Sequence, residues 1–186
     1  MKTGHVELAR AQQELWQTAY ERDPHLHGTE PSAAARSAAE VFGAAGIDDV
    51  LELGAGQGRD ALYLARQGFS VHATDFSDSA LHQLRLDAQR EGLDDRVTAA
   101  LHDVRDPLPP RDATVNAVFA NLLLNMAFSR AELWSLVAEI HRVLRPAASS
   151  CTPSGRQTTL VPTTGRSSRT AWLCTTASPA ASSTSP

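Results

Sequence analysis

The sequence lacks the features of several large protein classes. It has only two cysteines, Cys151 and Cys174, and their positions suggest neither a metal site nor a disulfide framework. No apolar run approaches the roughly 20 residues that a membrane-spanning helix needs. The first residues also lack the apolar core of a secretory signal. We therefore expect a cytoplasmic protein with no membrane partner.

A basic surface is missing as well. The formal net charge is −4 and the isoelectric point is near 5.9, whereas non-specific nucleic-acid binding needs an excess of positive charge. The seven histidines are scattered along the chain and form no pattern of metal ligands. We expect no nucleic-acid partner and no metal.

Three zones of the 186 residues differ in composition. Residues 1–46 have a helical pattern, residues 47–146 alternate between strand and helix patterns, and residues 147–186 contain no Asp, Glu or Lys. The last zone is rich in Ser, Thr, Ala and Pro, with too little apolar surface to offset the entropy cost of ordering. We expect a helical segment, a folded core and a disordered tail.

The middle zone predicts an α/β fold. Short apolar strands are expected at 48–53, 69–74, 96–101 and 113–120, with helices after the first, second and fourth. Alternation of this kind favours a doubly wound, mostly parallel sheet with right-handed crossovers. Helix starts are predicted at Ser77 and at Ser129, which forms a capping-box pattern with Glu132.

The end of the first zone predicts a further helix. Pro31 is acceptable in the first turn of such a helix, Thr29 or Glu30 could cap it, and Gly46 would end it.

A glycine-rich turn follows the first strand. Gly54, Gly56 and Gly58 form a G-x-G-x-G pattern, which is one residue shorter than a dinucleotide fingerprint and lacks the lysine of a P-loop. Glu52 would repel a pyrophosphate, but it would attract a cationic or hydrogen-bond-donating ligand such as an amino-acid ammonium group. Gly56 would allow the backbone to approach that ligand closely.

Polar residues also follow the next three strands. Asp75 ends the second strand, where a carboxylate can accept hydrogen bonds from ribose hydroxyls or cap the following helix. Asp103 follows the third strand and Asn121 the fourth; the alternatives are a solvated loop residue for Asp103 and a turn residue for Asn121. The carboxyl edge of an open α/β sheet binds ligands, so we expect a site at this edge.

These motifs together resemble those of the class I S-adenosylmethionine-dependent methyltransferases. The resemblance rests on "VLELGAGQGRD", "DFS" and "RVLRP", and it covers residues 47–146. It implies a Rossmann-like fold with S-adenosylmethionine as the cofactor. It also implies roles for individual residues: Glu52 and the turn Gly54, Ala55, Gly56 and Gly58 at the methionine part, Asp75 at the ribose, Phe76, Asp103 and Val104 at the adenine, and Asn121 beside the sulfonium and amino group.

Two aromatic residues of the first zone share a helix face. Trp16 and Tyr20 are four residues apart and could simply pack together. Because an N-terminal helix often covers the cofactor in the resembled family, Tyr20 is also a candidate cofactor contact.

The sequence departs from the family pattern in two places. Asn116 replaces the usual Asp before the fourth strand, and Ala147-Ala148 replaces the usual Gly-Gly after "RP". One lost nucleotide would turn Pro-Gly-Gly-Leu codons into codons for Pro-Ala-Ala-Ser, which is the sequence found. We therefore expect a sheet truncated after the fourth strand and its helix, with a tail that is a frameshift product.

The resemblance implies methyl transfer to a small molecule. No nucleophilic side chain is required for that reaction, so no catalytic residue is predicted. Two alternatives stay open: a truncated remnant that binds the cofactor without turnover, and a nicotinamide-dependent oxidoreductase, which the glycine spacing and Glu52 disfavour. Methylation of nucleic acid is a lesser alternative.

Overall fold

The computed structural model describes residues 2–145, so the predicted tail at 147–186 and its origin lie outside the described residues. The elements follow one another as α1 (Lys2–Arg22), α2 (Ala33–Ala44), β1 (Asp49–Leu53), α3 (Arg59–Arg66), β2 (Ser70–Asp75), α4 (Asp78–Arg90), β3 (Val97–Leu101), β4 (Ala117–Ala120), a 3-10 helix (Leu123–Asn125) and α5 (Arg130–Val143). The alternation of strands and helices agrees with the prediction for the middle zone.

The strands of the described chain form one four-stranded sheet in the order β3-β2-β1-β4, and every neighbouring pair is parallel. The β1–β2 and β2–β3 pairs are parallel because α3 and α4 connect their strands, whereas a segment without a helix leads from β3 to β4. The chain enters at the centre of the sheet with β1, moves outward to β2 and β3, and returns to the other side with β4. This reversal of direction creates a switch point at the carboxyl ends of the central strands.

Two apolar layers lie on opposite faces of the sheet. Alternate residues of the strands point to each layer, so that Val50 packs with α2, α3 and α4, whereas Leu51 packs with α5. The largest buried side chains include Phe42 and Phe119 in the first layer. Helices on both faces of a parallel sheet confirm the predicted doubly wound, Rossmann-like fold.

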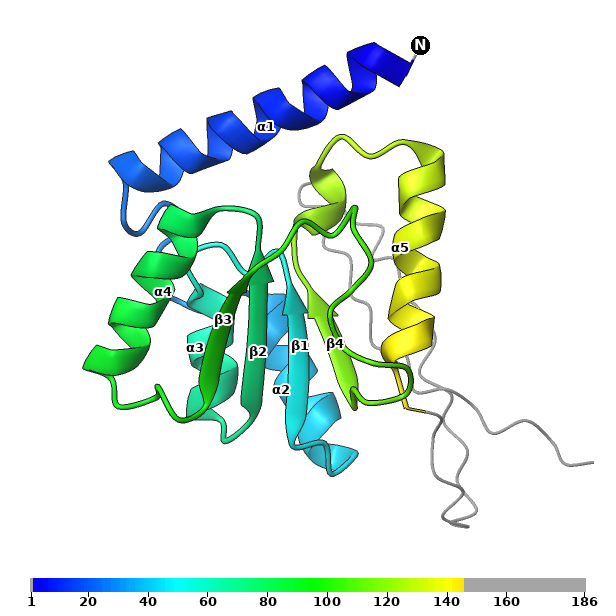
Figure 1. Cartoon of the computed structure of the whole chain (residues 1–186). Helices are drawn as coiled ribbons and strands as arrows, with labels where there is room; N and C mark the ends of the chain where they lie inside the picture. The colour runs from blue at the N-terminus through cyan, green and yellow to red at the C-terminus, as the bar shows by residue number, and fades with distance from the viewer. Residues whose placement is uncertain (1, 146–186) are drawn as a thin grey trace, which may run out of the picture.

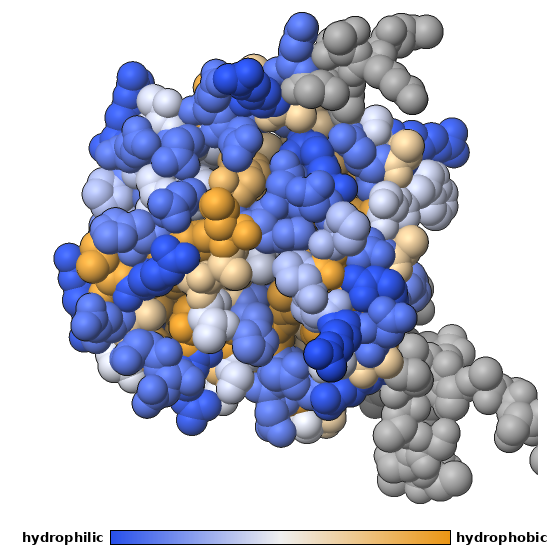
Figure 2. All heavy atoms as spheres, in the orientation of Figure 1, coloured by the Kyte–Doolittle hydropathy of each residue, from blue (hydrophilic) through white to orange (hydrophobic). Residues whose placement is uncertain are grey.

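The long helix α1 lies apart from these layers, across the carboxyl ends of the strands (Figure 1). It therefore covers the edge at which the sequence predicts a ligand site. Hydrophilic side chains cover most of the face seen in Figure 1, with smaller apolar patches between them (Figure 2). Within residues 2–145, no helix is both long enough and apolar enough to cross a membrane.

Two local predictions about α2 were wrong. The helix begins at Ala33, its N-cap is Ser32 instead of Thr29 or Glu30, and Pro31 precedes the helix. The Ser32 hydroxyl oxygen accepts a hydrogen bond from the Ala35 N–H, which is the usual capping interaction. The predicted caps Ser77 of α4 and Ser129 of α5 are confirmed, the latter with its complete capping box.

The fourth strand is shorter than the predicted range 113–120. Its first residues bond elsewhere, because the N–H groups of Thr114 and Val115 donate to the carbonyl of Val143 at the end of α5. Val115 also forms an isolated parallel bridge with Leu144. Between these segments, Asn116 donates both its backbone and side-chain N–H groups to Asp49. A second carboxylate at position 116 would lie against that of Asp49, which gives a physical reason for the amide found there.

Candidate functional site

A cavity opens beneath α1 at the carboxyl ends of β1, β2 and β4. The structure brings eight of the eleven predicted site residues into its wall: Tyr20, Glu52, Gly54, Ala55, Gly56, Asp75, Phe76 and Asn121. The other three, Gly58, Asp103 and Val104, are not among its lining residues. The wall therefore combines the glycine turn with residues from the second and fourth strand ends and from the N-terminal helix.

Glu52 is the most unusual group in the cavity wall. Its side chain is only 3% exposed, and its Oε2 has no hydrogen-bond partner among residues 2–145. Burial raises the pKa of Glu52 well above its ordinary value, and the nearby carboxylates of Asp60 and Asp75 raise it further. A buried polar atom without a partner costs free energy unless a ligand supplies one. Glu52 is thus poised to accept a hydrogen bond from a cation or another donor.

Asp75 joins the glycine turn to the loop after β2. One of its carboxylate oxygens accepts from the Gly56 N–H at 2.8 Å, and the other accepts from the Ser77 N–H at 2.8 Å. Burial raises the pKa of Asp75, while these backbone hydrogen bonds oppose the rise. A carboxylate has about four acceptor positions, so Asp75 can accept from ligand hydroxyls as well. The cap of α4 is Ser77 and not Asp75, which leaves the carboxylate at the cavity.

The glycines of the turn make room for protein groups. All three have positive φ angles. A Cβ atom on Gly58 would lie 2.1 Å from Cδ1 of Leu84 in α4, so this glycine permits close packing of two helices. A Cβ atom on Gly56 would lie 2.9 Å from the Tyr20 hydroxyl oxygen. Gly56 therefore allows α1 to approach the turn, in addition to any approach of a ligand.

Aromatic side chains from α1 and the loop after it cover the cavity. The rings of Trp16 and Tyr20 stack at a centroid distance of 5.6 Å, and His27 lies 5.8 Å from Trp16 and 6.2 Å from Tyr20. Burial raises the pKa of the Tyr20 hydroxyl, and the negative charge of Asp75 raises it further. Tyr20 and Trp16 thus do pack together, and the same two residues line the cavity.

Asp103 and Val104 have other partners. Both carboxylate oxygens of Asp103 accept from Nη1 of Arg105, at 3.2 and 3.3 Å, and one of them also accepts from the Arg105 N–H. The Arg105 guanidinium lies over the ring of Phe128, at 4.9 Å from its centroid. Val104 is buried in the apolar layer beneath α5. The Asp103 carboxylate still influences the site, because its negative charge contributes to the raised pKa of Asp75.

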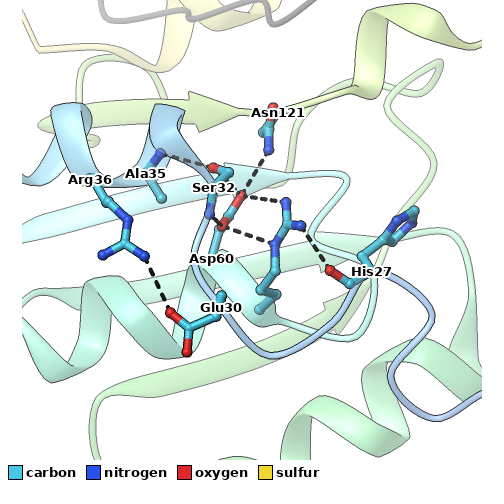
Figure 3. Close-up of polar contacts among 8 residues, drawn as sticks. His27, Glu30, Ser32, Ala35, Arg36, Asp60 and Asn121 are labelled. Carbon is cyan, nitrogen blue, oxygen red and sulfur yellow. Dashed lines mark hydrogen bonds and ion pairs between the residues drawn. The ribbon is translucent and has the colours of Figure 1, made fainter. Parts of the chain in front are cut away.

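The sequence reasoning missed Asp60, a carboxylate with several polar partners at the cavity (Figure 3). This carboxylate, 5% exposed, accepts from the backbone N–H and the hydroxyl of Ser32, each at 2.8 Å, and pairs with Arg59. It also accepts from Nδ2 of Asn121 at 2.9 Å. The only sequence signal was an acid in the first turn of α3, where acids are common because they interact favourably with the helix dipole.

Gln57 and Arg59, also missed, attach the segment after α1 to the glycine turn. The Gln57 side chain accepts from the Leu26 N–H at 3.0 Å and donates to the Asp23 carbonyl at 2.6 Å. Arg59 donates to the carbonyl of His27 at 3.0 Å. These contacts fix the cover of the cavity relative to its floor. Within the described residues no cluster of three or more potential metal ligands occurs.

Comparison with protein families gives one assignment. A family model described as a methyltransferase domain matches residues 50–147, which is more than half of the chain. A comparison with curated proteins finds no match.

Solved structures with the same fold include three with informative names. Phosphoethanolamine N-methyltransferase 1 of Haemonchus contortus, in complex with phosphoethanolamine and S-adenosylhomocysteine, has a TM-score of 0.57 and 23% identity over 76% of this chain and 31% of its own. A protein of Methanococcus maripaludis described as a candidate S-adenosyl-L-methionine-dependent methyltransferase has a TM-score of 0.54 and 22% identity, over 75% of this chain and 58% of its own. The [4+2]-cyclase SpnF has a TM-score of 0.52 and 29% identity, over 62% of this chain and 42% of its own. The chain therefore spans between about a third and three fifths of the length of these proteins, and the two likenesses below 25% identity show the fold alone.

Proposed function

This chain belongs to the methyltransferase domain family, and on that premise we propose that it binds S-adenosylmethionine and transfers a methyl group to a small molecule. The observation that carries the proposal is the buried Oε2 of Glu52, which lacks a partner among the described residues and lines the cavity. S-adenosylmethionine carries an ammonium group that would supply this partner. It also supplies a methyl group already activated by the sulfonium.

The residues of the cavity wall fit this cofactor. Glu52 would hold the ammonium group of the methionine part, and Asp75 would accept hydrogen bonds from the ribose hydroxyls. A wall with two buried carboxylates at this point would repel a pyrophosphate, which disfavours the nicotinamide alternative. Contacts of Phe76, Asp103 and Val104 with the adenine are proposed from the family resemblance.

The cover over the cavity has a mechanistic role in the proposal. Trp16 and Tyr20 place apolar rings over the glycine turn and would exclude water from the bound ligands. Methyl transfer needs the acceptor atom, the methyl carbon and the leaving sulfur in line, and positioning of this kind can supply about 7–11 kcal/mol. The chain then needs no nucleophilic side chain. A base is needed only when the acceptor atom carries a proton that must leave.

A small acceptor agrees with the net charge of the whole chain and with the shape of its described part. The cavity lies under a helix and not along an open basic groove, and the chain has a net charge of −4. Both features disfavour a nucleic-acid acceptor. The acceptor itself can be sought by incubating the protein with S-adenosylmethionine and pools of amines, phenols and thiols, and by looking for methylated products in the mass spectrum.

The cofactor is tested first by thermal unfolding. A ligand in hundredfold excess over its Kd adds about 2.7 kcal/mol to the free energy of unfolding. Millimolar S-adenosylhomocysteine should therefore raise Tm, whereas the same concentration of NAD should not. A protein with normal circular dichroism whose Tm responds to NAD alone, or to neither compound, would contradict the proposal.

A second candidate is cofactor binding without methyl transfer. It is favoured by the [4+2]-cyclase among the structures of the same fold, because the name of that protein describes a reaction other than methyl transfer. It predicts a rise in Tm with S-adenosylhomocysteine, but no methylated product in any acceptor pool. The two assays together separate the candidates.

A further inference from the structure

The Asp60 cluster connects three parts of the chain at the cavity. Asp60 lies in the first turn of α3, Ser32 is the cap of α2, and Asn121 follows β4 directly. Both Asp60 and Asn121 line the cavity. The cluster thus holds the end of β4 against the glycine turn, through partners that are 28 and 61 residues away in the sequence.

The chemistry of Asp60 decides which end of the Asn121 amide faces it. An ionised carboxylate only accepts hydrogen bonds, so the Asn121 NH2 group must point toward it. The distance from Asn121 Nδ2 to Asp60 Oδ2 is 2.9 Å, and Figure 3 shows the amide oxygen directed away from Asp60. That oxygen therefore lies on the side of the amide that is available to a ligand at the cavity wall.

We propose that Asp60 is a positioning residue that orients the Asn121 amide so that its oxygen accepts a hydrogen bond from the ammonium group of the cofactor. The inference rests on the proposed function, because it concerns the same site. Glu52 and Asn121 then form two acceptors for one ammonium group, one from the end of β1 and one from the end of β4. With the amide reversed, the cavity would present an N–H donor to a cation and repel it.

The test exchanges the two polar groups. In Asp60→Asn the new amide keeps its oxygen on the Ser32 N–H and turns its NH2 group toward position 121, so Asn121 must reverse. In the double variant Asp60→Asn/Asn121→Asp, the NH2 group at position 60 donates to the new carboxylate. The second oxygen of that carboxylate then faces the cavity, and an acceptor is restored.

The ligands are S-adenosylhomocysteine and 5′-methylthioadenosine, which keeps the adenosine and the thioether but has no ammonium group. We expect Asp60→Asn to raise the Kd of S-adenosylhomocysteine by about tenfold or more and to change the Kd of 5′-methylthioadenosine by less than about twofold. The double variant should restore the affinity for S-adenosylhomocysteine. Each Kd is measured by calorimetry, on variants whose circular dichroism matches the unaltered protein.

The matched control is Ser32→Ala. It removes the hydrogen bond from the Ser32 hydroxyl to Asp60 Oδ2, the oxygen that also accepts from Asn121. It also removes the N-cap of α2, but it leaves the Asn121 amide in place. It should lower Tm without changing the ratio of the two Kd values.

Three results would overturn the inference: equal weakening of both ligands in Asp60→Asn, no weakening of either, or a folded double variant without rescue. Unaltered protein that binds both ligands equally well would also overturn it, together with the contact between Glu52 and the ammonium group, although binding of S-adenosylhomocysteine would still support the cofactor. Unaltered protein that binds neither would overturn the proposed function and this inference together.

Discussion

Polar residues follow β1 and β2 as well as β3 at the carboxyl edge of the sheet, but they have different partners in these two regions. In the β1–β2 half, Glu52 and Asp75 are buried, line the cavity and lie beside the backbone of the glycine turn. In the β3 part of the edge, Asp103 pairs with Arg105 and Val104 joins the apolar layer under α5. The same kind of residue at a strand end is thus a cavity group in one half and a loop-fixing group in the other.

The difference shows what decides the fate of a carboxylate at a strand end. Asp75 receives the Ser77 N–H from its own loop and the Gly56 N–H from the loop after β1, which is next to it because β1 and β2 are neighbours. Asp103 lies after the edge strand β3, where a side chain two residues later satisfies it. The carboxylate after the β3 edge thus serves its own loop, whereas β1, β2 and β4 place polar side chains in the cavity wall.

The largest effect should come from Gly58, which supports the β1–β2 half. In Gly58→Ala, strain from a positive φ costs about 1–2 kcal/mol, and the contact with Leu84 adds overpacking of about 1–3 kcal/mol. Gly46→Ala is the matched control, because Gly46 also has a positive φ but a Cβ atom at this position would have nothing within 4 Å. Chemical denaturation should show a clearly larger loss for Gly58→Ala. Equal losses would mean that the close packing of α3 and α4 at this glycine is unimportant.

The next largest effect should be a loss of ligand affinity in Asp75→Ala, for which Asp103→Ala is the comparison. Asp75→Ala should weaken S-adenosylhomocysteine by about ten- to a hundredfold, because a hydrogen bond to a charged group contributes about 1.5–3 kcal/mol. Asp103→Ala should weaken the binding of S-adenosylhomocysteine by less, since the Asp103 carboxylate already accepts hydrogen bonds from Arg105. Calorimetry on both variants gives the ratio. A larger loss in Asp103→Ala would reverse the comparison and move the main ligand contact to the β3 part of the edge.

A smaller effect should appear in the pH dependence of stability. Burial raises the pKa of Glu52, so the folded protein holds this proton more tightly than the unfolded chain. The contribution is fully present below the unfolded pKa of about 4.3 and is lost as the pH rises through the folded pKa. The slope is at most about 1.4 kcal/mol per pH unit.

Glu52→Gln should flatten this part of the profile, because glutamine does not titrate. The matched control is Glu40→Gln, which replaces an exposed glutamate of α2. Denaturant unfolding between pH 4 and pH 8 measures the slopes, where a decrease in the free energy of unfolding with pH is expected for the unaltered protein. Equal slopes in all three proteins would show that burial does not raise the pKa of Glu52.

Much of the fold could be predicted from the sequence, for local reasons. The apolar strands, the caps Ser77 and Ser129 and the glycine turn are short patterns whose partners lie within a few residues. The predicted start of α2 was wrong because Ser32, the N-cap, is also held by a hydrogen bond to Asp60, which is distant in the sequence. The length of β4 was wrong because the chain at the end of α5 takes the N–H groups of Thr114 and Val115.

The candidate site divides in the same way. Glu52 and Asp75 could be proposed because the end of a strand fixes their place, and the structure puts both in the cavity wall. Asp60 could not, since its partners Ser32 and Asn121 meet only in the folded chain. The roles of all these residues toward a ligand stay predictions.

The most direct measurement of the central claim, that the β1–β2 half holds the cofactor, is hydrogen exchange of the backbone with and without S-adenosylhomocysteine. We expect the strongest slowing in peptides that contain residues 52–58 and 74–77, and a weaker change in residues 102–105. Exchange that slows only outside these segments, or nowhere while the protein stays folded, would contradict the claim.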